Sequence, residues 1–129
     1  MAQASAITIN DGQATPVATT FNPVAVTPAL SSFADRSAGI ALGFRQLQVR
    51  NTFASGKSTV NRSRFDVAIP VTQTVNGVTT VAYTLRAKVE FILPDGSTDA
   101  NRKDLYAFIT NGLNHTLVKG AMRDLDPLY

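Results

Sequence analysis

Apolar and polar side chains alternate along three segments in the middle of the chain, residues 44–52, 62–69 and 81–91. Successive side chains of a β-strand point to opposite faces, so this alternation predicts three strands of a sheet with one apolar face. Pro70 is expected to end the second strand. The apolar positions that we expect to face a core are Leu47, Val49, Phe65, Val67, Leu85 and Val89.

The first third of the chain has a weaker pattern. Residues 6–10 predict a strand, Asp11-Gly12 a tight turn, and residues 15–21 a second strand that pairs with the first. Two prolines in residues 22–30 predict a loop or an interrupted edge strand. A weak strand is expected at residues 30–34. Between the first and second alternating segments, the polar residues 54–58 predict a turn.

Asn76-Gly77 is the strongest two-residue hairpin signal in the chain. It lies between the second and third alternating segments, within residues 71–80. We therefore expect a long hairpin that joins two neighbouring strands of the sheet.

The period of the pattern changes after Pro94-Asp95-Gly96. Ser97 or Thr98 can cap a helix, in which Leu105, Phe108 and Ile109 recur at helical spacing. A shorter helix is expected from about residue 116 to 125, with its apolar side buried. The residues expected on that buried side are Leu117, Ala121 and Leu125.

Strands followed by helices predict an α+β fold, an antiparallel sheet with an N-terminal hairpin and two C-terminal helices. We expect one domain over residues 1–129. It would comprise a hairpin and loop (1–35), the main strands (36–93) and the helices (97–126). Two helices can bury only part of the apolar face of such a sheet. A dimer with a continuous sheet and exchanged helices would cover that face and protect the sheet edge.

The polar face of the three main strands is rich in arginine, lysine and glutamine. The formal net charge of the chain is +3, but residues 36–90 carry eight basic side chains against Asp66 and Glu90. Amide and hydroxyl groups between the cations could recognise base edges or sugars. We favour RNA or another polyanion over an ordinary solvated sheet face. The candidate RNA-binding residues are Gln46, Gln48, Arg50, Arg62, Arg64, Asp66, Thr84, Arg86, Lys88 and Glu90.

Several other classes of function are disfavoured. Gly56-Lys57-Ser58-Thr59 resembles the end of a phosphate-binding loop, but Asn51 stands where that motif needs its first glycine. His115 is the only histidine and cysteine is absent, so we expect no metal site and assign His115 to capping a helix C-terminus as a cation. Asp66 and Glu90 lie among cations, which suits ion pairs better than acid catalysis. We therefore expect no enzyme activity, catalytic residue, cofactor or small-molecule substrate.

The chain has no apolar run of membrane-spanning length and no signal-peptide pattern at its start. We expect a soluble protein, made in a cytoplasm, without a membrane partner.

Three segments resemble coat proteins of the single-stranded RNA bacteriophages, the levivirus group. The segment from Pro70 to Val78, with its flanking strands, is similar to their long hairpin. Residues 97–106 resemble the start of their first helix. The ending Leu125-Asp126-Pro127-Leu128-Tyr129 is similar to their terminal Pro-x-Tyr pattern. The resemblance covers residues 40–129; the first 40 residues share only a hairpin.

The resemblance implies a homodimer whose two sheets join and whose helices cover the partner's sheet. Such dimers form an icosahedral shell, the virion, assembled in the bacterial host cytoplasm. The inner sheet face would bind single-stranded viral RNA, including a stem-loop whose binding represses translation. Residues 71–80 would take different shapes around the symmetry axes. The implied dimer core is Leu47, Val49, Phe65, Val67, Leu85, Val89, Leu105, Phe108 and Ile109.

The sequence departs from the family pattern on the RNA face. Arg86 stands where relatives tend to have an aromatic ring, and Gln46 and Arg64 replace small hydroxyl residues. A guanidinium plane can also stack on a base, so RNA binding need not be lost. A non-capsid RNA-binding β-domain is the alternative interpretation.

Overall fold

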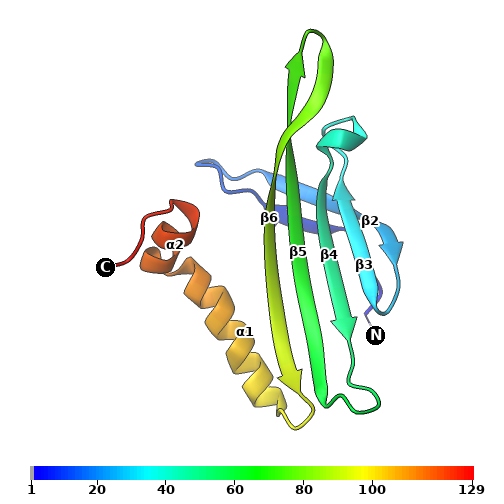
Figure 1. Ribbon diagram of the computed structural model, residues 1–129, viewed down its shortest axis with the longest axis vertical. Coiled ribbons are helices and arrows are strands. Elements are labelled where there is room, and N and C mark those ends of the chain that lie inside the picture. The colour runs from blue at the N-terminus through cyan, green and yellow to red at the C-terminus, as the bar shows by residue number, and fades with distance from the viewer. Residues whose placement is uncertain (1) are drawn as a thin grey trace. The chain divides into compact units, whose positions relative to one another are not determined.

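The computed structural model describes residues 2–129 as an antiparallel sheet of six strands followed by two helices (Figure 1). This confirms the predicted α+β fold. The strands lie in sequence order across the sheet, and a short 3-10 turn, η1 (Ala41–Gly43), precedes the fourth. The elements are β1 (Ile7–Asn10), β2 (Ala18–Val26), β3 (Leu30–Asp35), β4 (Arg45–Thr52), β5 (Val60–Val75), β6 (Val78–Pro94), α1 (Asp99–Asn114) and α2 (Thr116–Arg123).

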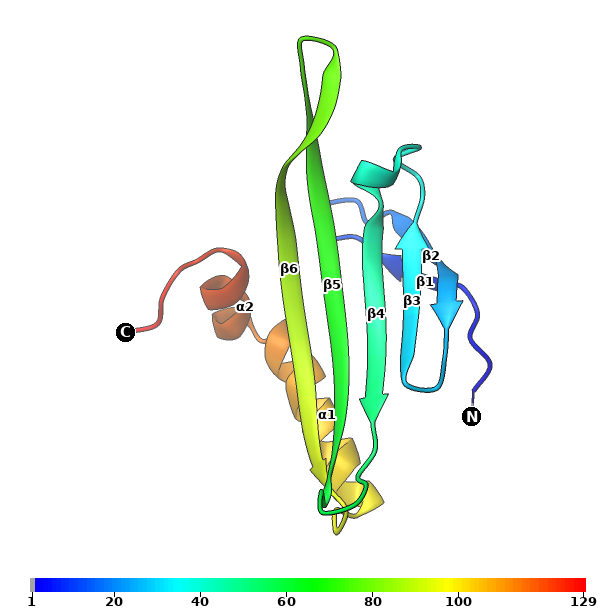
Figure 2. The same cartoon turned by 45° about the vertical axis from the view of Figure 1, so that its right-hand side comes forward.

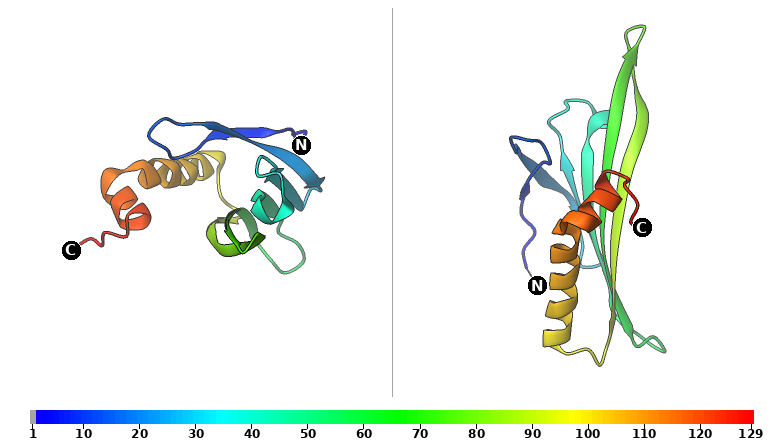
Figure 3. Two further views of the ribbon diagram at one scale, coloured as in Figure 1. Left: turned by 90° about the horizontal axis from the view of Figure 1, so that it is seen from above. Right: turned by 90° about the vertical axis from the view of Figure 1, so that its left-hand side faces the viewer.

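The chain forms two compact units, which divide between Ile92 and Leu93. The first holds the sheet, in which β3, β4, β5 and β6 lie side by side (Figure 2). β1 and β2 run obliquely to these strands, so the sheet is curled (Figure 3).

The region containing Pro23 is an irregular strand and not a loop. β1 pairs with β2 only from Ala18 to Phe21, and β2 then pairs with β3 from Asn22 to Val26. The register shifts between Pro23 and Ala25. Pro23 lies opposite Phe33 of β3 at this irregularity, and beyond the part of β2 that pairs with β1. A residue without an N–H is tolerated at such an irregular, one-sided position of a sheet.

The prediction that Pro70 ends a strand is wrong, since β5 continues through it to Val75. The ladder between β4 and β5 ends at Ala68, so Pro70 lies where no β4 partner needs an N–H donor. The strand therefore projects beyond β4 as one half of the long β5–β6 hairpin (Figure 1).

The Asn76-Gly77 turn is confirmed. Both residues have positive φ, 51° and 77°, as a type I′ turn requires. Next to the turn, the hydroxyls of Thr74 and Thr79 lie 3.2 Å apart across the hairpin. The strands are therefore paired close to the tip.

Two of the three best-buried large apolar residues come from strands with a weak sequence pattern. Phe21 of β2, Phe33 of β3 and Leu47 of β4 form the core cluster, and Leu47 is only 1% exposed. Leu47 lies opposite Phe33 on one side and Val67 on the other. The short β3 was predicted as weak, yet it supplies a central side chain of this core.

In the second unit, the predicted cap of α1 is confirmed: Thr98 Oγ1 accepts a hydrogen bond from Asn101 N at 3.2 Å. His115 lies at the C-terminus of α1, as predicted, where its backbone N–H donates to Gly112 O at 3.0 Å. Its side chain caps the following helix instead, because Nδ1 accepts a hydrogen bond from Leu117 N at 3.4 Å at the start of α2. The chain turns sharply there between the two helices (Figure 3).

α2 ends at Arg123, two residues before the predicted end. Leu125 has a φ of 57°, a left-handed conformation that is incompatible with continuation of the α-helix. The expected burial of Leu117 and Leu125 is wrong for a single chain, in which they are 60% and 82% exposed, and Ala121 is half-buried. Among residues 2–129, no helix has the length and apolar character needed to span a membrane.

Candidate nucleic-acid interface

The register between β4 and β5 gathers the predicted polar residues on one face. Gln48 lies opposite Asp66 and Arg50 opposite Arg64, while Gln46 lies opposite Ala68. The pairs that alternate with them, Leu47 with Val67 and Val49 with Phe65, lie on the other face. The structure thus separates the predicted polar and apolar sets as the alternation indicated.

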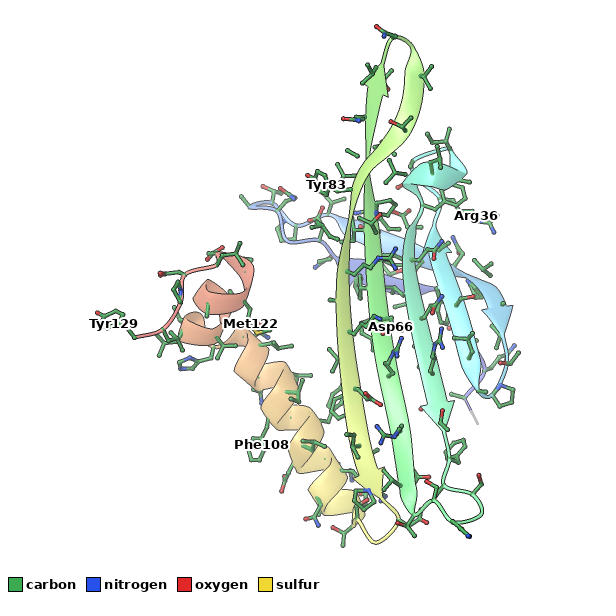
Figure 4. All side chains as sticks on the ribbon, viewed as in Figure 1. Arg36, Asp66, Tyr83, Phe108, Met122 and Tyr129 are labelled. Carbon is green, nitrogen blue, oxygen red and sulfur yellow. The ribbon has the colours of Figure 1, made fainter. Side chains whose placement is uncertain are left out.

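A shallow depression of about 200 Å³ lies on the polar face. We call it the basic hollow. β4, β5 and β6 all contribute to it, and Asp66 lies near the middle of β5 (Figure 4). Its polar lining is Gln46, Gln48, Arg50, Arg64, Asp66, Arg86 and Lys88.

The other three predicted residues do not line the hollow. Arg62 Nη1 donates to Glu90 Oε1 at 3.1 Å, which links β5 to β6 through an exposed ion pair. Such pairs contribute little to stability, but this one neutralises both charges. Thr84 is half-buried on β6, also outside the lining.

Arg64 and Asp66 form a bidentate ion pair inside the hollow. Arg64 Nε donates to both carboxylate oxygens of Asp66, at 2.8 and 2.9 Å, and Nη2 lies 2.8 Å from Oδ2. The hydrogen bond to Asp66 raises the pKa of Arg64 above its ordinary value. The Asp66 side chain is only 14% exposed, so its carboxylate faces Arg64 more than solvent.

Three cations of the hollow have no carboxylate partner. Among the residues that the structure describes, Arg50, Arg86 and Lys88 are exposed and take part in no ion pair. Arg50 Nη2 donates instead to Gln48 Oε1 at 3.1 Å. With Asp66 neutralised by Arg64, the hollow keeps a net positive charge that attracts polyanions.

Two arginines from the charge-rich middle of the chain have other roles. Arg45 pairs with the buried Asp35, with Nε to Oδ2 at 2.8 Å, and Ser37 N and Oγ also donate to that carboxylate at 3.0 Å. Burial alone would raise the pKa of Asp35, but the hydrogen bonds from Ser37 and Arg45 lower it below its ordinary value. Arg36 lies 5.9 Å from the centre of the Phe44 ring. Both arginines thus stabilise the β3–β4 connection.

Sequence reasoning missed part of the hollow. Val67, Ala68 and Ala87 also line it. Alternation alone assigns Val67 and Ala87 to the other face. Over residues 2–129, no three potential metal-ligating side chains of His, Cys, Asp or Glu gather in one place.

The fold and sequence are similar to those of known phage coats. The chain resembles the virus-like particle of bacteriophage ESE058 at 28% identity, with a TM-score of 0.89 over 99% of this chain and 100% of that one. It resembles the virus-like particle of bacteriophage NT-214 at 27% identity, with a TM-score of 0.89 over 99% of this chain and 100% of that one. The capsid protein of bacteriophage GA shares the fold at 14% identity, with a TM-score of 0.73 over 97% of each chain.

No curated protein sequence matches the chain. The sequence model of the levivirus coat protein family, however, matches residues 2–129, which is the whole of the described chain. The predicted resemblance is therefore confirmed, and this chain belongs to the levivirus coat protein family.

Proposed function

We propose that this protein self-assembles, through dimers, into an icosahedral shell that packages single-stranded viral RNA against the basic hollow. Family membership gives it a structural role in a capsid. The observation that carries the proposal is the contrast between the two faces of one sheet. The basic hollow has three unpaired cations, and the opposite face leaves large apolar side chains exposed.

The exposed apolar residues support a dimer. On the sheet, Phe65, Tyr83 and Leu85 are 37%, 58% and 55% exposed, although they alternate with polar residues as core-facing positions do. Monomeric proteins rarely leave such contiguous apolar surface in water. A second copy of the chain would cover it and so remove it from solvent.

The helices have the same need for a partner. Phe108 of α1 is 74% exposed, and Leu117 and Met122 of α2 are 60% and 66% exposed. Figure 4 labels Phe108 and Met122 on these helices. We propose that these helices pack on the sheet of the partner, with the dimer core formed by the apolar residues predicted from the sequence. Leu47, which is fully buried within one chain, would anchor that core without reaching the partner.

The cations of the hollow support RNA binding. Phosphates provide most of the affinity in such interfaces, and Arg50, Arg86 and Lys88 are free to contact them. Gln46 and Gln48 lie beside these cations and can bind base edges or sugars. A dimer that binds an RNA stem-loop at the start of a viral gene in this way would also repress its translation.

Expression of the full chain tests the proposal. We expect discrete shells by negative-stain electron microscopy, containing RNA that survives nuclease treatment. A species that stays small under all solution conditions would contradict the capsid role of this chain. Shells that form equally well without nucleic acid, and protect none, would contradict RNA packaging. Repression is tested separately: a viral stem-loop is placed at the start of a reporter gene, and translation of the reporter is measured with and without the dimer.

A further inference from the structure

The polar groups of the basic hollow are unequally divided between donors and acceptors of hydrogen bonds. Arginine and lysine side chains carry only donors, and Arg50, Arg86 and Lys88 leave theirs without a carboxylate. The hollow therefore offers many N–H groups to a ligand, and its preference among ligands depends on which hydrogen-bond acceptors remain free.

The acceptors are largely occupied within the protein. Both oxygens of Asp66 accept from Arg64, and its side chain is 14% exposed. The amide oxygen of Gln48 accepts from Arg50 at 3.1 Å, which leaves the NH2 group of Gln48 for a ligand. Gln46 is then the one polar side chain of the lining whose acceptor has no partner among the described residues.

RNA bases differ in the groups that they present to such a site. Guanine carries two neighbouring acceptors, O6 and N7, which match the two parallel N–H groups of an arginine. Adenine carries an amino group in place of O6, so it needs an acceptor beside N7, as a glutamine with a free carbonyl provides. An amino group that enters the site without an acceptor loses its hydrogen bond to water.

We propose that the basic hollow binds guanine in preference to adenine, through the guanidinium fork of Arg50 or Arg86. This inference rests on the proposed RNA-binding function and adds a base preference to it. The Gln48–Arg50 and Arg64–Asp66 hydrogen bonds create the preference, because they occupy two of the three acceptor-bearing side chains of the lining. Only Gln46 is left to meet an adenine amino group, whereas Arg50 and Arg86 offer two guanidinium forks to guanine. Contacts with the phosphates are the same whether the nucleotide carries guanine or adenine, so they do not contribute to the base preference.

The test compares two short RNAs of equal length, one of repeating UUG and one of repeating UUA, bound to the full-length dimer at one salt concentration. We expect the guanine-containing RNA to bind at least about fivefold more tightly. Equal affinities, or tighter binding of the adenine-containing RNA, would overturn the base preference and leave the RNA-binding function intact. Failure to bind either RNA would contradict the proposed function itself.

A double variant, Arg50→Lys with Arg86→Lys, keeps the charge of the hollow and removes both guanidinium forks. We expect the ratio of the two affinities to fall toward one, while binding of each RNA persists through the phosphates. The matched control is Lys57→Arg, which exchanges the same residue types outside the hollow and should leave the ratio unchanged. A double variant that folds, as shown by circular dichroism, and keeps the parent ratio would overturn the assignment to these arginines.

Discussion

Arg50 of β4 lies directly opposite Arg64 of β5 on the same face of the sheet. Like charges at directly opposed positions destabilise a sheet. Here each arginine donates a hydrogen bond to a residue two positions away on its own strand. Arg64 donates to Asp66, which follows it, and Arg50 donates to Gln48, which precedes it. The two partners thus reduce the repulsion between the arginines, and Arg50 remains available to a ligand.

Replacement of Asp66 by Asn should separate stability from RNA affinity. The variant loses the carboxylate that offsets the Arg50–Arg64 repulsion, so we expect a lower urea midpoint of unfolding. It also frees Arg64, so RNA binding at low salt should tighten. Glu90→Gln is the matched control, because its ion pair with Arg62 is exposed and should contribute less to stability. Equal midpoints for the two variants would show that Asp66 has no special role.

Loss of two free cations should change the salt dependence of RNA binding. Each phosphate contact with single-stranded RNA contributes about 0.7 to the slope of log affinity against log salt. For Arg86→Ala with Lys88→Ala, measured between roughly 50 and 200 mM salt, we expect the slope to fall by about 1.4 where both side chains contact phosphates and by about 0.7 where Arg86 contacts a base. An unchanged slope would mean that RNA binds to another face of the protein.

The buried Asp35 should make folding sensitive to acid. Its pKa in the folded state lies below the ordinary value of 3.8, so the stabilisation is fully present above that pH. It is lost as the pH falls from 3.8 through the folded pKa. Urea unfolding at a series of pH values should show this decline, and Asp35→Asn should remove its share of it. The same variant should cost about 2 kcal/mol at neutral pH, because it weakens the hydrogen bonds to Ser37 and Arg45. An acid slope that is the same in the variant would contradict this role.

The tip of the long hairpin should depend on Gly77. Its φ of 77° is unfavourable for any residue with a Cβ, so Gly77→Ala should cost roughly 1–2 kcal/mol of unfolding free energy. Gly12→Ala is a suitable control, since an added Cβ there meets nothing within 4 Å and φ is not positive. If the two variants unfold at the same urea concentration, the type I′ turn is not required.

An aspartate on α1 should prevent dimerisation. Leu105 is 37% exposed in a single chain, and the proposed dimer buries it. Leu105→Asp would place an unpaired charge in that interface, at a cost of several kcal/mol. We expect a species of monomer size by analytical ultracentrifugation at micromolar concentration. Assembled particles of the variant would show that this position is not buried by a partner.

Local patterns predicted much of the fold because the physics behind them is local. The alternation in β4, β5 and β6, the Asn76-Gly77 turn and the Thr98 cap each depend on a few neighbouring residues. Phe33 could not be assigned to the core in this way, because its burial depends on neighbours from other strands, β2 and β4. The prediction from Pro70 was wrong for the opposite reason. A proline disrupts a strand by removing an N–H donor, and beyond the end of the β4 ladder no β4 residue needs that donor.

The candidate site was predicted less completely than the fold. The face shared by Gln48, Arg50, Arg64 and Asp66 follows from alternation. The division of its cations into paired and free groups requires the side-chain geometry of the sheet. In the same way, Arg45 counts toward the positive charge of the sequence but is neutralised by Asp35, a partner ten residues away. Net charge along the chain therefore overstates the charge that an RNA would meet.

A cryo-electron microscopy reconstruction of assembled particles that contain RNA tests the proposed assembly most directly. We predict dimers in which α1 of each copy packs on the apolar face of its partner's sheet. We also predict that the basic hollow faces the interior, with RNA density next to Arg50, Arg86 and Lys88. Particles in which the hollow faces the outside, or in which the apolar sheet face contacts the RNA, would contradict the proposed assembly.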